Sequence, residues 1–221
     1  GDNQNWTSYA DATQVAPGFA SDSVDAIVFD GLNGLTNVAN NNRNYVLARW
    51  ISGGTFYLVS TKHASLDEYE SGQTVNGFVK TGNASQAFLK LAKDSWDWGD
   101  LSGEDANVTW ETGVAAVKNT LESNDQAYDY YILAQPVLFA STNALKQKGV
   151  TLNVVANLQV EWAKAHDGAR IPAAGLFVNK TRYAAHKGAI DAWLSEVDER
   201  ITNAIDNPSV AVAALNAYAN S

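Results

Sequence analysis

Residues 23–35, SVDAIVFDGLNGL, place a short apolar run directly before a polar turn that contains glycine. The run at residues 24–29 has the length of a buried strand, and Asp30-Gly31 ends it. We expect residues 32–40 to form a short helix. This stretch therefore predicts a strand, a turn and a helix in succession, which is the repeating unit of an α/β fold.

The same alternation of strands and helices continues along the chain. Apolar runs predict strands at residues 24–29, 45–50, 55–60, 73–80, 108–110, 128–134, 151–158 and 175–178. Helical spacing and capping residues predict helices at residues 11–20, 32–40, 84–93, 114–121, 136–149, 190–205 and 210–218. Alternating strands and helices favour mainly parallel sheets with helices on both faces.

Composition excludes several classes of function. The chain has 221 residues, 46% of them hydrophobic, which is enough for a buried core. A net charge of −9 disfavours binding to nucleic acid or to an anionic membrane surface. The absence of Cys excludes disulfides, thiolate nucleophiles and cysteine metal sites. We expect no cofactor.

Three predicted junctions lie where a strand ends and a helix begins. They are residues 30–34, residues 81–85 and residues 134–136. Free backbone N–H groups at a helix start attract anionic or polar ligands, so each junction is a candidate binding loop. Ordinary helix capping and turn glycines explain the first two junctions equally well, and Gln135 in the third can instead satisfy the local backbone.

Four stretches carry a resemblance in their order and spacing. They are SVDAIVFDGLNGL from Ser23, YVLARWISGGTFYLVS from Tyr45, YDYYILAQPVL from Tyr128 and IPAAGLFVNK from Ile171. In this order they resemble the solute-binding proteins of bacterial ABC importers, in the branch with thiamine-precursor and alkylsulfonate-binding proteins. The similarity covers nearly the whole chain, and no single motif is diagnostic.

The resemblance implies a type II periplasmic-binding fold of two lobes. Residues 1–53 and 173–221 would form the first lobe, and residues 54–172 would form the second. Ligand would bind between the lobes, which close by hinge motion. Family members begin with a further strand and helix that this sequence lacks, and it also contains no Met. We therefore expect a processed or incomplete chain.

The candidate ligand-binding residues lie at the junctions and beside the first crossing between lobes: Asp30, Gly31, Asn33, Trp50, Thr55, Thr81, Gly82, Asn83, Ser85 and Gln135. Trp50 offers a ring that can stack on a planar ligand, or it belongs to the core. In the family the position of Gln135 often faces the cleft, and its amide suits a neutral polar ligand.

Metal and catalytic sites have weaker support in the sequence. The acidic loop of Asp94, Asp97, Asp100, Glu104 and Asp105 does not have the spacing of an EF-hand, so we interpret it as a solvated loop rather than a calcium site. His63, His166 and His186 are far apart and form no metal-binding pair. We predict neither a metal ion nor catalytic residues.

The leading hypothesis is the solute-binding component of a bacterial ABC importer, outside the cytoplasmic membrane and monomeric. Its partners would be a small polar or planar aromatic or anionic metabolite and the permease, with any lipid anchor upstream of Gly1. The alternatives are an enzyme that reuses the same fold, as in menaquinone-pathway enzymes and porphobilinogen deaminase, and a ligand-sensing domain.

Overall fold

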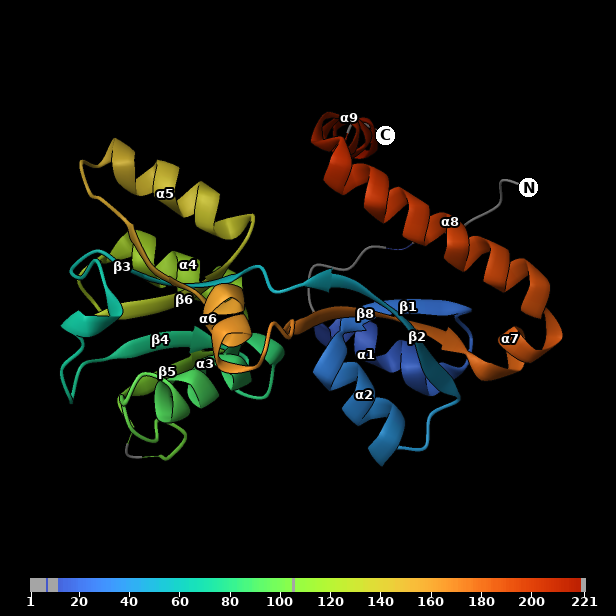
Figure 1. The fold of residues 1–221 in the computed structure, drawn as a ribbon, viewed down its shortest axis with the longest axis horizontal. Helices are drawn as coiled ribbons and strands as arrows, with labels where there is room; N and C mark the ends of the chain where they lie inside the picture. Colours follow the sequence, from blue (N-terminus) through green and yellow to red (C-terminus); the bar gives the residue numbers. More distant parts are fainter. Residues whose placement is uncertain (1–6, 8–11, 105, 220–221) are drawn as a thin grey trace.

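The computed structural model describes residue 7, residues 12–104 and residues 106–219. The elements form two bodies side by side, which we call lobe 1 and lobe 2, joined by extended chain (Figure 1). Lobe 1 combines the beginning of the chain with its end, so blue and orange elements lie together in Figure 1, whereas lobe 2 is formed by the middle of the chain.

Lobe 1 consists of α1 (Ala12–Ser21), β1 (Ala26–Asp30), α2 (Gly31–Asn40), β2 (Tyr45–Gly53), β8 (Pro172–Asn179), α7 (Lys180–Ala185), α8 (Lys187–Asp206) and α9 (Pro208–Ala219). Lobe 2 consists of β3 (Phe56–Ser60), the 3-10 helix η1 (Leu66–Glu68), β4 (Val75–Phe78), α3 (Asn83–Asp94), β5 (Val108–Glu111), α4 (Val114–Ser123), β6 (Tyr130–Ala134), α5 (Val137–Gln147), β7 (Asn153–Asn157) and α6 (Leu158–Ala165).

Each lobe contains one sheet, and each sheet has a strand from a crossing at its interior. The three-stranded sheet of lobe 1 has the order β1-β8-β2, and the five-stranded sheet of lobe 2 has the order β5-β4-β6-β3-β7. Strand β8 comes directly from lobe 2 and lies between β1 and β2. Strand β3 comes directly from lobe 1 and lies between β6 and β7.

The two-lobed α/β fold class is confirmed, but the expected direction of pairing is wrong for much of it. Both pairings in the described part of lobe 1 are antiparallel, β1 with β8 and β2 with β8. In lobe 2, β3 pairs antiparallel with β6 and β7, and only the β4 pairings with β5 and β6 are parallel. The two strands that cross between the lobes, β8 and β3, each run in the direction opposite to both of the strands they pair with.

Most of the predicted elements are confirmed within a few residues. The first predicted helix is confirmed from Ala12 onwards and tolerates Pro17, while Asp11 lies outside the described residues. Among the described residues, two α-helices and the short 3-10 helix η1 were not predicted. Helix α6 follows β7 without a break and is capped by the Asn157 side chain, and α7 follows β8 and is capped by Asn179. In both, a strand turns directly into a helix at an Asn.

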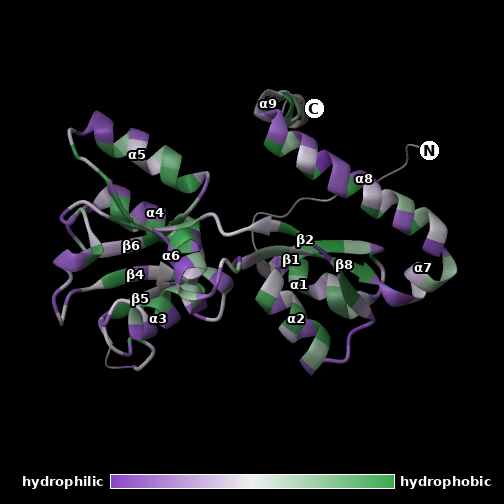
Figure 2. Ribbon diagram, in the orientation of Figure 1, coloured by the Kyte–Doolittle hydropathy of each residue, from purple (hydrophilic) through white to green (hydrophobic). Residues whose placement is uncertain are grey.

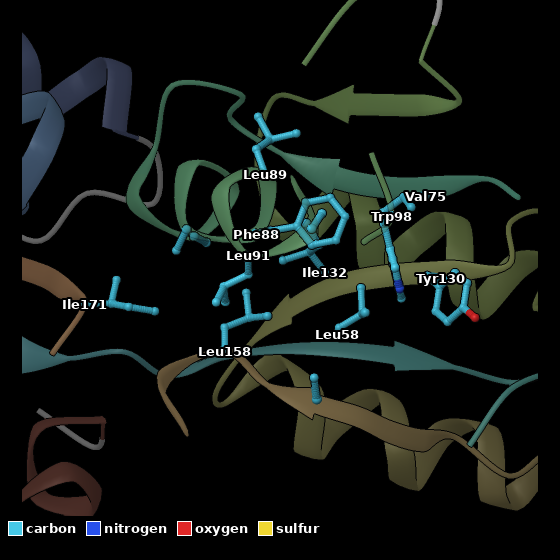
Figure 3. Packing of buried hydrophobic residues seen from close by; sticks show 14 residues of the cluster. Leu58, Val75, Phe88, Leu89, Leu91, Trp98, Tyr130, Ile132, Leu158 and Ile171 are labelled. Carbon is cyan, nitrogen blue, oxygen red and sulfur yellow. The ribbon is translucent and has the colours of Figure 1, made fainter. Parts of the chain in front are cut away.

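Lobe 2 holds the larger core. One cluster packs α3 and α6 against a face of the sheet, with Phe88, Leu91, Ile132 and Leu158 fully buried (Figure 3). A second cluster, which includes Val117 and Leu145, packs α4 and α5 on the other face. The sheet of lobe 2 is therefore covered on both faces, as an α/β sheet requires.

Lobe 1 has a smaller core centred on aromatic side chains. Phe19 of α1 meets Phe29, Tyr45 and Phe177 edge-on, at ring-centroid distances of 5.6, 5.3 and 5.3 Å. Helix α8 extends diagonally away from this sheet (Figure 1), and hydrophilic and hydrophobic residues alternate along it (Figure 2). Within the described residues, no helix is long and apolar enough to cross a bilayer.

We predict that Phe88→Ala lowers the free energy of unfolding by about 3–5 kcal/mol, because it empties a fully buried site in lobe 2. Phe139→Ala, on α5 of the same lobe, is the matched control, since that ring is 67% exposed, and it should change stability by about 0.5 kcal/mol or less. Urea unfolding measures both. Equal losses in the two variants would contradict the assignment of the core.

Candidate functional site

The two crossings between the lobes are bonded to each other. The first runs through Gly54 and Thr55, and the second enters β8 at Pro172. The Gly54 N–H donates to the Ile171 carbonyl at 3.2 Å. Gln159 of α6 accepts from the Ile171 N–H at 2.9 Å, which attaches the second crossing to lobe 2. The two crossings therefore lie side by side where the lobes are joined.

Helix α2 begins at the first predicted junction, near the second crossing. Asp30 is its N-cap residue, and the Asn33 N–H donates to the Asp30 Oδ1 at 2.9 Å. Gly31 lies against the indole ring of Trp50 on β2. A Cβ at residue 31 would approach the Trp50 Cζ3 to 2.1 Å, so only glycine allows this contact. Trp50 is 44% exposed, so it lies at the surface rather than in the core.

Helix α3 of lobe 2 begins at the second predicted junction and touches lobe 1. The Asn83 side chain is buried, and its Nδ2 donates to the Ala173 carbonyl on β8 at 2.8 Å. Ala174, the next residue, is the cross-strand partner of Asp30. The starts of α2 and α3 therefore lie close together on either side of the second crossing, and the two helices are in contact.

The Asp30 carboxylate lies between these two helix starts. Burial raises its pKa above the ordinary range, since a partly buried carboxylate loses hydration. The N–H groups of Asn33 and Leu32 on α2, and that of Asn83 on α3, oppose the rise because they favour the ionised form. Asp30 therefore interacts with groups from both lobes.

Gly82 and Ser85, in the second junction, make hydrogen bonds within lobe 2. The buried Ser85 hydroxyl donates to the Phe78 carbonyl, and the Gly82 N–H donates to the Val79 carbonyl at 2.7 Å. Thr81 is exposed. These contacts match the capping alternative, and Asn83 is the residue of this junction that reaches lobe 1.

The third predicted junction lies beside the first crossing. The Gln135 N–H donates to the Thr55 carbonyl at 3.0 Å, and both residues are exposed. Pro136 is the N-cap residue of α5. The described contacts therefore bring together Asp30, Gly31, Asn33, Trp50 and Asn83 as one group, and Thr55 with Gln135 as another.

A cavity of about 570 Å³ adjoins the first group, a volume within the range of small-molecule sites. Both lobes line it, through Leu32 of α2, Asn83 and the outer face of α3, Trp162 of α6 and the second crossing. Asn83 is the one predicted ligand-binding residue in its wall. The sequence analysis missed Gln86 and Lys90, although their spacing from Asn83 places them on one face of a helix.

The acidic loop forms ion pairs with α3 rather than an acidic cluster. Asp94, the last residue of α3, pairs with Lys90 of the same helix at 2.6 Å, and Asp100 of the loop pairs with Lys93 at 2.7 Å. The Lys93 ammonium and the Ser102 donors hold the pKa of Asp100 well below its usual range. Asp105 lies outside the described residues. Across the described residues there is no group of three or more His, Asp or Glu that could hold a metal ion.

The three histidines lie in different surroundings. His63 stacks on Tyr130 with ring centroids 5.0 Å apart, and its Nδ1 lies 3.6 Å from the Glu68 Oε2. His166 ends α6 beside Trp162, and His186 precedes α8. The described contacts do not join them into one site.

Comparison with solved structures identifies the fold. No protein-family model and no curated protein matches the sequence. The chain has the two-lobed fold of ABC-type periplasmic substrate-binding proteins, with type II topology. One such structure is the periplasmic aliphatic sulphonate binding protein SsuA from Escherichia coli, with a TM-score of 0.68 and 10% identity over 94% of this chain and 65% of that one.

Two further structures have the same fold at similar identity. The alkanesulfonate-binding protein SsuA from Xanthomonas axonopodis pv. citri, bound to MOPS, has a TM-score of 0.62 and 13% identity over 93% of this chain and 65% of that one. The ligand-binding component of an ABC-type import system from Staphylococcus aureus has a TM-score of 0.61 and 13% identity, covering 86% and 60%. This chain thus spans 60–65% of the length of these proteins.

We predict that Gly31→Ala destabilises the protein by about 1–3 kcal/mol, because the new methyl group overlaps the Trp50 ring. In a Trp50→Leu background most of that cost should disappear, and a double-mutant cycle measures the difference. Gly103→Ala is the control, since a Cβ there meets nothing within 4 Å. An unchanged cost in the Trp50→Leu background would contradict the contact.

A second prediction concerns pH. Because burial raises the folded-state pKa of Asp30, its contribution to stability is fully present below the unfolded pKa of about 3.9 and is lost as the pH rises through the folded pKa. Asp30→Asn keeps a good N-cap side chain but does not ionise. The Tm of Asp30→Asn minus that of the native protein should therefore increase between pH 4 and pH 7.

The control for this series is Asp67→Asn, which removes a carboxylate that is exposed in lobe 2. Its Tm difference from the native protein should stay level over the same pH range. A flat or falling difference for Asp30→Asn would show that Asp30 is not destabilised by burial.

Proposed function

We propose that this chain is the extracytoplasmic solute-binding component of a bacterial ABC importer. The observation that carries the proposal is the meeting of two helix starts, at Asp30 and Asn83, beside the second crossing between the two lobes. Helix starts present free N–H groups, and polar ligands bind where such groups converge. The fold shared with ABC-type substrate-binding proteins supports the same assignment.

In this proposal the two lobes are residues 1–53 with 173–221, and residues 54–172. Ligand binds between them and contacts both only when they close, so it shifts the population toward the closed form. The ligand-binding residues are Asp30, Gly31, Asn33, Trp50, Thr55, Thr81, Gly82, Asn83, Ser85 and Gln135. Binding and hinge motion complete the role without covalent chemistry.

The proposed ligand is a small polar or planar aromatic or anionic metabolite. Two of the compared proteins are named for binding sulphonates, which supports a small organic molecule as the ligand. The proposed partner is an ABC permease that recognises the closed form. The protein would act as a monomer outside the cytoplasmic membrane, with any lipid anchor upstream of Gly1.

A thermal-shift screen tests this function. Metabolite pools that contain pyrimidines, thiamine precursors, sulfonates and amino acids are added to the purified protein, and bound compounds are identified by mass spectrometry. A ligand at a hundred times its Kd adds about 2.7 kcal/mol, or roughly 5–10 °C in Tm. Recovery of the compound unchanged supports binding. Conversion of the compound supports an enzyme, and a flat screen of ligand-free protein contradicts both.

Closure can be measured separately because the chain contains no Cys. Ala140 on α5 and Glu199 on α8 are exposed and lie in different lobes, so a double-cysteine variant at these positions carries one spin label on each. Ligand should shift the distance distribution between the labels. The control pair, Ala140 and Asp67, lies within lobe 2 and should not respond. A cross-lobe distance that ligand leaves unchanged would exclude hinge closure.

A further inference from the structure

The cavity beside the second crossing has one apolar wall. Helix α3 contributes one face to the cavity, on which Asn83, Ala87 and Lys90 lie together. The apolar wall combines Leu32 of α2 in lobe 1 with Trp162 of α6 in lobe 2 and with the second crossing. Leu32 is 38% exposed, and Trp162 is partly buried. A ligand in the cavity would therefore cover apolar surface from both lobes, which is favourable in water.

The other wall carries the cationic groups of the cavity. Lys80 lies just before α3, and its ammonium donates to the Ser102 carbonyl at 2.8 Å. The Gln86 amide donates to the Lys80 carbonyl at 2.7 Å, and the Lys93 ammonium lies 2.7 Å from the Asp100 carboxylate. These bonds hold the loop after α3 against the exposed side of that helix. The cavity is therefore apolar beside α6 and cationic beside the loop.

The residues that line the cavity carry an excess of positive charge, although the whole chain has a net charge of −9. The charged lining residues are Lys80, Lys90, Lys93, Asp94 and Asp100. Asp94 pairs with Lys90, and Asp100 pairs with Lys93. Among the described residues Lys80 has no carboxylate partner, and its printed bond is to a backbone carbonyl. Lys80 is therefore the ammonium whose charge is left for a ligand anion to balance.

The two ion pairs do not prevent their lysines from contacting a ligand. The side chains of Lys90 and Lys93, and of their aspartate partners, are exposed. Exposed ion pairs contribute little to stability, and each ammonium has three N–H donors. Both lysines can therefore donate to an anion while they retain their carboxylates. Asp30 caps α2 and does not line the cavity, so its carboxylate is not part of this wall.

We propose that this cavity is a binding site for a small organic anion with an aromatic or aliphatic body. The anionic group binds Lys80, with Lys90 and Lys93 as further donors, and the apolar body covers Leu32 and Trp162. The volume of about 570 Å³ suits a ligand of that size. The inference goes beyond the proposed function, because it requires no closure of the lobes and shares only Asn83 with the ligand-binding residues proposed above.

Four probes test the proposal by isothermal titration at pH 7. Indole-3-acetate is an anion with a ring, indole-3-acetamide is its neutral counterpart, tryptamine is a cation with the same ring, and acetate is an anion without a ring. Native protein should bind indole-3-acetate most tightly, because this probe alone matches both walls. Indole-3-acetamide should bind more weakly for lack of charge, and acetate should bind more weakly for lack of apolar surface.

Variants assign the two walls separately. Lys80→Gln should lower the affinity for indole-3-acetate about fivefold and leave that for indole-3-acetamide unchanged, because it removes only the charge. Lys80→Arg keeps the charge and should keep the affinity. Trp162→Leu should weaken both ring probes, because it removes apolar contact. Lys146→Gln is the matched control: Lys146 is also exposed, but it lies on α5, which covers the other face of the lobe 2 sheet.

Three results would each overturn the inference. They are no detectable binding of indole-3-acetate, binding of tryptamine as tight as that of indole-3-acetate, and a Lys80→Gln variant that binds like Lys146→Gln. If Lys80→Gln also lowers the Tm, the affinity of Lys80→Arg decides between charge and structure. The proposed function is tested separately, since the metabolite screen and the distance between spin labels report a solute and lobe closure whether or not these probes bind.

Discussion

The constraint on which the rest of the structure depends is that each crossing of the chain enters the interior of a sheet. Strand β8 arrives from lobe 2 and pairs with both β1 and β2, and β3 arrives from lobe 1 and pairs with both β6 and β7. Without β8 the described sheet of lobe 1 has no pairing left, and without β3 strand β7 loses its partner in lobe 2. The hydrogen bond between the Gly54 N–H and the Ile171 carbonyl then joins the two crossings to each other.

This constraint also determines where the helix starts lie. Helix α2 follows β1, whose last residue pairs with Ala174 near the start of β8. Helix α3 contacts the same strand through the bond from Asn83 to Ala173. Because both helices begin beside one crossing, their positive ends converge, and a carboxylate at residue 30 becomes a feature of both lobes. The electrostatics of the site follow from topology rather than from a local motif.

The sequence predicted the elements well and the site only in part. The strand and helix at residues 24–40 were predictable because their pattern is local: an apolar run, then Asp30 as cap. Helix α6 was missed because Asn157 ends β7 and caps the helix at once, with no intervening turn residues. Parallel pairing was expected from alternation of strands and helices, and that rule does not apply to strands that cross between lobes.

Long-range contacts explain the rest of what sequence reasoning missed. The Asn83 contact with Ala173 joins residues 90 positions apart, and nothing near either residue signals it. The importance of Gly31 depends on the Trp50 ring from another strand. The pairing of Lys90 with Asp94 and of Lys93 with Asp100 likewise emerges only once the helix and the loop are placed in space.

The two lobes also differ in how their stability arises. Lobe 2 is continuous in sequence and has two buried clusters around a five-stranded sheet. Lobe 1 has one small aromatic cluster, and its central strand follows the whole of lobe 2 in the chain. Joining β8 to β1 and β2 therefore requires closure of a long loop, and this closure has an entropic cost. Folding of lobe 2 lowers that cost, because it brings the two ends of the loop together. Contacts such as Asn83 with Ala173 add to the link between the lobes, so a ligand that bridges them would stabilise the weaker lobe through the stronger one.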